Sequence, residues 1–127
     1  AINSGDYDAA IRAYHRALEA NPKDQDAAAG LAQVSLLQRL GTQDPNQLRA
    51  NAAEHPTGIE EQLAVADLDI SGGHIEDAFA RALDLFAAHF GKEREPIRLR
   101  LLDYFALLGA EDPRVIQARQ QLANLLY

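Results

Sequence analysis

The chain has 127 residues, of which 47% are hydrophobic and 6% aromatic, a composition that suits one domain of close-packed helices. Its formal net charge of −7 disfavours nucleic acid as a partner, because an acidic surface repels the phosphate backbone. The lack of cysteine excludes disulfides, thiolate metal ligands and thiol catalysis within these residues. No run approaches the roughly 18 apolar residues of a membrane span, so no membrane partner is expected.

Apolar residues at helical spacing, interrupted by glycine and proline, predict seven helices joined by short turns. In chain order, the expected ranges are about 6–20, 24–40, 45–54, 59–72, 74–90, 93–108 and 113–127. Asp24 and Asp44 are expected to cap the second and third helices. The third helix is short and polar. On the fifth, Phe86 and Phe90 are both expected to face the core. The sixth is apolar on more than one side, which is typical of a helix buried on most sides.

The segment Gly5–Pro22 resembles the second helix of a tetratricopeptide (TPR) repeat, with Ala10, Tyr14 and Ala17 at the positions of its small and aromatic residues. The segment Gly73–Phe79 repeats the start of this pattern 68 positions later, which is twice the 34-residue TPR period. This resemblance implies an all-α, right-handed TPR-like superhelix. The expected units are a truncated first repeat 1–22, a degenerate repeat 23–55, a repeat 56–91 and a C-terminal helix pair 92–127. Accordingly, the second helix should pair with the third, the fourth with the fifth and the sixth with the seventh.

In such a superhelix the first helix of each pair lines a concave groove. Two helices are predicted to supply the groove residues Asp26, Ala29, Gln33, Leu37, Glu60, Leu63, Asp67 and Ile70. This mixture of apolar and acidic groups could hold an extended peptide, or the surface could bind nothing specific. Ala29 and Gln33 stand where TPR domains that grip the acidic tails of heat-shock chaperones have Lys and Asn, so that partner class is disfavoured.

No residue pattern predicts catalysis, a metal site or a cofactor. The four histidines lack metal-ligand spacing, and no nucleophile elbow surrounds any serine. Asp67 and Asp69 interrupt an apolar run, but two positions apart on a helix they do not face each other, so a solvated face is the preferred interpretation. The chain is therefore predicted not to be an enzyme in its own right.

The end of the chain is an apolar cluster that is either a capping helix or a docking surface. The cluster contains Leu122, Leu125, Leu126 and Tyr127. Together with Arg119, it resembles the C-terminus of the chaperedoxins, which are bacterial co-chaperones with an N-terminal thioredoxin-like domain and a TPR domain. The stretch from Glu54–His55–Pro56 to Gly73–Ala78 also resembles the central part of that family.

The resemblance implies a cytoplasmic holdase whose TPR part binds unfolded clients and whose last helix docks on the chaperonin. The implied docking residues are Arg119, Leu122, Leu125, Leu126 and Tyr127. An upstream thioredoxin-like domain is expected, and the first helix, which lacks its repeat partner, could form a homodimer. Two alternatives stay open: a general TPR scaffold in a multiprotein assembly, and the regulatory domain of an enzyme whose catalytic domain lies upstream.

Overall fold

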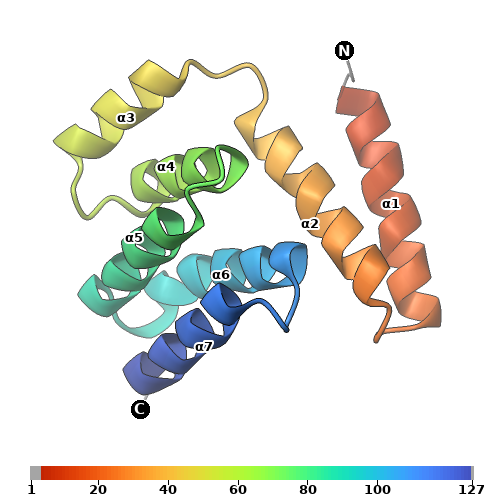
Figure 1. Cartoon of the computed structure of the whole chain (residues 1–127). Coiled ribbons are helices and arrows are strands. Elements are labelled where there is room, and N and C mark those ends of the chain that lie inside the picture. Colours follow the sequence, from red (N-terminus) through yellow and green to blue (C-terminus); the bar gives the residue numbers. More distant parts are fainter. Residues whose placement is uncertain (1–3, 127) are drawn as a thin grey trace.

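A computed structural model of the chain describes residues 4–126 and confirms the predicted all-α class (Figure 1). These residues form seven α-helices and one short 3₁₀ helix, and they contain no strand. In chain order the elements are α1 (Ser4–Ala20), α2 (Gln25–Leu40), α3 (Pro45–Glu54), α4 (Ile59–Ser71), α5 (Ile75–Ala88), η1 (Gly91–Arg94), α6 (Glu95–Leu108) and α7 (Pro113–Leu126).

Local sequence signals set most of the helix boundaries. The Asp24 side chain accepts a hydrogen bond of 3.0 Å from the Ala27 amide, and Asp44 accepts one of 3.0 Å from the Asn46 amide, so both predicted N-caps are confirmed. These carboxylates satisfy amides in the first turn that have no partner within the helix. At the other end of α2, Gly41 adopts a φ of +51°, a conformation that side-chain-bearing residues rarely reach.

The fifth helix is shorter than predicted, and Phe90 does not face the core. α5 ends at Ala88, and His89 and Phe90 are extended, with φ values of −123° and −136°. Because the helical periodicity stops two residues earlier, the Phe90 side chain points to solvent and is 74% exposed. By contrast Phe86, within the helix, is 1% exposed.

The His89 side chain bridges three segments at this helix end. Its Nε2 lies 2.8 Å from the Thr57 carbonyl oxygen, and its Nδ1 lies 3.1 Å from Oε1 of Glu93. Both partners are acceptors, so both bonds form at once only when the ring carries two protons. The geometry therefore favours the imidazolium, and the bonds to Glu93 and Thr57 raise the pKa of His89 above its usual 6.5.

This pKa shift predicts a pH-dependent stability. A raised folded-state pKa contributes stability that is fully present below 6.5 and is lost as the pH rises through the pKa of His89. An NMR titration should give a His89 pKa above 6.5, and Glu93→Gln should move it back toward that value because it removes the main cause. A His89 pKa that Glu93→Gln leaves unchanged would contradict this account.

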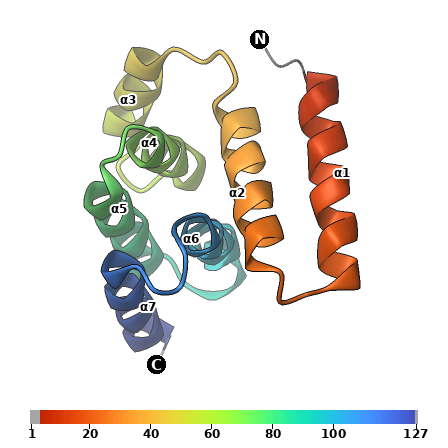
Figure 2. The same cartoon turned by 45° about the vertical axis from the view of Figure 1, so that its right-hand side comes forward.

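The helices pair differently from the prediction. α2 packs against α1, α6 and α4, whereas α3 lies against α4, so the expected pairing of the second and third helices is wrong (Figures 1 and 2). Since α3 buries only Leu48 and Ala52, it has little apolar surface to offer α2. α4 pairs with α5 as expected, but α7 lies mainly against α5 rather than α6.

One continuous core joins α4, α5, α6 and α7. α5 supplies the largest share of its buried residues, including Phe79, whose ring centroid lies 5.6 Å from that of Phe105 on α6. The opposite side of α6 is less buried than predicted, because Leu99 and Leu102 are 50% and 37% exposed. The core thus leaves an apolar strip of α6 in contact with solvent.

The α1–α2 hairpin is attached to this core through α2. No side chain described on α1 is fully buried; Tyr7, Ile11 and Leu18 are half-buried. α1 approaches α2 closely at Gly30, where a Cβ atom would lie 2.4 Å from Cζ of Tyr14. Of the three buried residues of α2, only Leu36 belongs to this core, and Leu40 packs against it.

Candidate interaction surfaces

The eight predicted groove residues do not line one open groove. On α4, Leu63, Asp67 and Ile70 are buried, with exposed fractions of 3%, 2% and 6%, because α2 and α6 pack over them. The others are more accessible: Ala29 is half-buried, and Asp26, Gln33, Leu37 and Glu60 are exposed. The concave face expected between the second, fourth and sixth helices is therefore largely closed by contacts among those helices.

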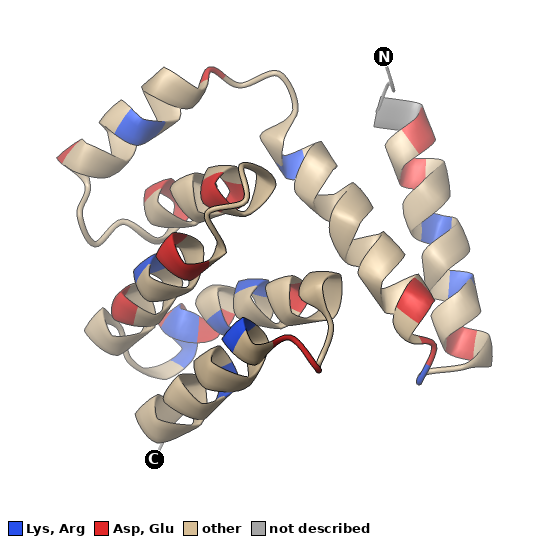
Figure 3. Ribbon diagram, viewed as in Figure 1, with Lys and Arg blue, Asp and Glu red and all other residues tan. Residues whose placement is uncertain are grey.

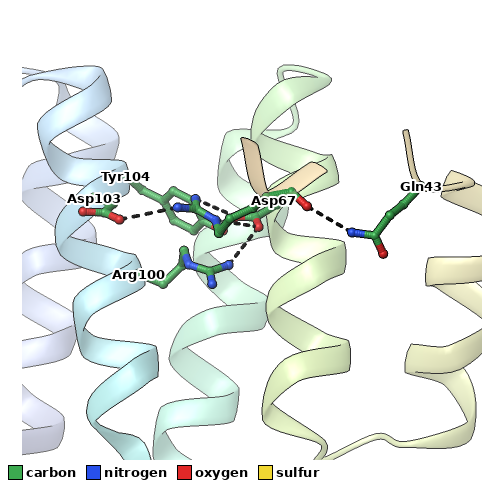
Figure 4. Close-up of polar contacts among 6 residues, drawn as sticks. Gln43, Asp67, Arg100, Asp103 and Tyr104 are labelled. Atoms are coloured by element: carbon green, nitrogen blue, oxygen red, sulfur yellow. Dashed lines mark hydrogen bonds and ion pairs between the residues drawn. The ribbon is translucent and has the colours of Figure 1, made fainter. Parts of the chain in front are cut away.

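A buried carboxylate stands at the centre of these contacts. Asp67 accepts four hydrogen bonds, as the close-up in Figure 4 shows in part. Arg39 of α2 donates Nε and Nη2 at 3.0 Å each, Arg100 of α6 donates Nη1 at 2.8 Å, and Tyr104 of α6 donates its hydroxyl at 2.6 Å. One side chain of α4 thus joins α2 to α6 through charge-assisted bonds, which are stronger than bonds between neutral groups.

The cluster is balanced in charge. The guanidinium of Arg39 also lies 3.6 Å from Oδ2 of Asp103, so two arginines face two carboxylates. Burial raises the pKa of Asp103, although the charges of Arg39 and Arg100 oppose this change. Burial, followed by the charge of Asp67, raises the pKa of the Tyr104 phenol far above its usual value of 10.0, so Tyr104 stays a hydrogen-bond donor.

Asp69 is buried as well, on the opposite side of α4, so the predicted solvated face for Asp67 and Asp69 is wrong. Its Oδ1 lies 3.2 Å from Nη2 of Arg49 on α3, and its Oδ2 lies 3.8 Å from Nε of Arg81 on α5. The amide of buried Gln62 donates to the carbonyls of Ala52 and His55 at the end of α3. Polar contacts therefore hold the short third helix in place.

A shallow apolar pocket of about 460 Å³ lies between the start of α2 and the end of α6. Ala28 and Ala29 form part of one wall, and Leu102 and Phe105 form part of the other. Arg119 of α7 also lines it, with its guanidinium 5.7 Å from the centroid of the Phe105 ring. Of the predicted groove residues, only Asp26 and Ala29 line this pocket.

The last helix has one buried side and one free side. Leu122 is 5% exposed and belongs to the core, whereas Leu125 and Leu126 are 37% and 43% exposed. Arg119 is exposed, and Tyr127 lies outside the described residues. No charged residue follows Arg119 in α7, so this end of the helix is uncharged (Figure 3). The structure thus separates one anchoring leucine from two accessible ones.

Comparison with protein families matches a tetratricopeptide repeat model to residues 38–127 and a second tetratricopeptide repeat model to residues 1–40. The chain belongs to the tetratricopeptide repeat family. TPR domains are helical scaffolds for protein–protein interactions, and they are generally non-catalytic. The boundary between the two matches falls at the end of α2, which is where the hairpin joins the rest of this TPR domain.

The domain is also similar to uncharacterised proteins of Mycobacterium bovis and Mycobacterium tuberculosis. Each is 33% identical over 126 residues, which is 99% of this chain but 41% of the relative. The chain therefore spans about two fifths of the length of these curated relatives. No solved structure matches it.

The described part of this TPR domain contains no group of three or more His, Asp or Glu side chains arranged to hold a metal ion. None of its described helices is both long and apolar enough to cross a membrane. The polar residues that matter most in the fold, Arg39, Arg100 and Tyr104, were not among the predicted sites. The sequence feature that could have indicated them is Asp67, since a carboxylate within an apolar helix needs a cationic partner.

Proposed function

We propose that this TPR domain is the binding part of a thioredoxin-like co-chaperone of the bacterial cytoplasm. It holds unfolded clients and docks on the chaperonin through its last helix, without catalysis and without a cofactor. The observation that carries the proposal is the exposure of Leu125 and Leu126 at an uncharged helix end whose sequence resembles the chaperedoxin tail.

The packing of α7 supports a docking role. Val115, Ala118 and Leu122 fix the helix to the core with exposed fractions of 0%, 2% and 5%. Because this anchor leaves Leu125 and Leu126 accessible, the two leucines can be buried by a partner without unfolding the helix. The rest of the exposed side of α7 is mostly polar, as in a capping helix, so the two accessible leucines are the feature that favours docking.

The proposal predicts that a double substitution, Leu125→Ser with Leu126→Ser, weakens chaperonin binding by about tenfold or more, as expected for two central apolar contacts. The helical circular dichroism should be unchanged because neither side chain belongs to the buried core. Interferometry with immobilised chaperonin measures the affinity. Ile116→Ser is a matched control, since Ile116 is an exposed apolar residue at the other end of α7.

Two outcomes would contradict the docking role. If the unaltered chain does not bind the chaperonin, the general scaffold with a capping helix becomes the better explanation. If the double variant binds as tightly as the unaltered chain, docking uses another surface. Dimerisation through α1 stays a prediction with weaker support, because the apolar side of α1 is already half covered by α2.

A further inference from the structure

We infer that the face formed by α4 and α6 is an interaction surface for an amphipathic, arginine-bearing helix, and that α2 is its resident occupant. A partner helix that presents the same residues would displace α2. This inference does not rest on chaperonin docking, because it concerns α4 and α6 and not the end of α7.

Three side chains of α2 make its contacts with the buried core and with Asp67. Leu36 is 3% exposed within the core, Leu40 packs against that core, and Arg39 forms a bidentate pair with Asp67. Spacings of three and four residues place these side chains on one side of a helix. The recognition element is therefore an arginine flanked by two leucines, and any helix with this arrangement could make the same contacts.

The receiving face selects a positive charge. Asp67 is 2% exposed and Asp103 lies beside it, while Arg100 is the cation that α6 itself supplies. Without Arg39, two carboxylates would face one guanidinium, and the buried Asp67 would lose two of its four hydrogen bonds. A helix with a neutral or acidic residue at this position would supply neither the missing positive charge nor the two lost hydrogen bonds.

The α1–α2 hairpin contributes few buried side chains to the core, so a partner helix could replace α2 on α4 and α6. Among the described residues, α1 has no fully buried side chain and α2 has three, of which only Leu36 belongs to the main core. The hairpin is connected to α3 by the exposed segment 41–44. Regions with few buried apolar contacts open with lower free energies than the core. The α1–α2 hairpin is therefore expected to separate from α4 and α6 as one unit.

The test uses the full chain and a fluorescent peptide with the sequence of residues 25–40. Arg39→Asp in the chain should repel its own α2 from Asp67 and Asp103. The peptide, which keeps Arg39, should then bind this variant about tenfold or more tightly than it binds the unaltered chain. The same peptide with the change Arg39→Asp should not bind. Arg12→Asp, on an exposed position of α1, is the charge-matched control and should give no gain.

Hydrogen exchange of the unaltered chain decides the matter if Arg39→Asp prevents folding. Amides of α1 and α2 should exchange together, about tenfold or more faster than those of α5. Equal protection of α2 and α5 would overturn the inference. It would also be overturned if the folded Arg39→Asp variant bound the peptide no better than the unaltered chain.

Discussion

Asp67→Asn is expected to lower the free energy of unfolding by about 3 kcal/mol, the lower end of the cost of breaking a buried ion pair. The carboxylate accepts bonds from Arg39, Arg100 and Tyr104, all directed at its two oxygens. Asparagine has the same shape but offers one acceptor oxygen, and its amide group would meet donors instead of acceptors. Two guanidinium groups would then share the single carboxylate of Asp103.

The lower end of the range applies because the arginines retain contact with water. The side chains of Arg39 and Arg100 are 24% and 20% exposed, whereas that of Asp67 is 3% exposed. Partial hydration reduces the penalty for an unpaired guanidinium. The expected loss is still a large fraction of the roughly 5–15 kcal/mol that stabilises a typical domain.

Urea unfolding followed by circular dichroism measures this effect. Asp84→Asn removes the same charge from an exposed position on α5 and should change the free energy of unfolding by no more than about 0.5 kcal/mol. If the two substitutions have equal effects, the four bonds to Asp67 do not stabilise the fold, and α2 is held by apolar packing alone.

The placement of Asp67 shows which part of the fold was accessible to sequence reasoning. Helix starts at Asp24 and Asp44 depend on neighbours two or three residues away, so the sequence predicts them well. The environment of Asp67 depends on Arg39 and Arg100, which are 28 and 33 positions away. Periodicity shows that a helix has an apolar side but does not identify which helix covers it, so the spacing of Asp67 and Asp69 gave no sign that α2 and α6 cover Asp67.

At the end of the chain, the sequence identifies the apolar residues but not which of them are buried. Helical spacing and composition indicate that Leu122, Leu125 and Leu126 form an apolar cluster. They do not show which of these leucines is buried and which are exposed. The division into one buried and two exposed leucines follows from the position of α7 against α5, which is a tertiary contact. Burial decides which of these residues are available to a partner.

Phe86→Ala is expected to lower the free energy of unfolding by about 4 kcal/mol. The Phe86 ring is 1% exposed, and the Arg94 guanidinium lies over it, 4.1 Å from the ring centroid. Truncation would leave a cavity in the core that joins α5 to α6 and would also remove this cation–π contact, which links α5 to η1. The apolar loss dominates, because the ring is buried whereas Arg94 is only half-buried.

Phe90→Ala removes the same ring four residues later and is the natural comparison. Phe90 is 74% exposed because α5 ends at Ala88, so its truncation should change the free energy of unfolding by no more than about 0.5 kcal/mol. Parallel urea titrations of the two variants measure the difference directly. Equal losses would mean that α5 continues through Phe90 in solution and that both rings face the core. A difference of several kcal/mol would place the end of the helix before His89, because only a break in the helical path separates two phenylalanines spaced one turn apart.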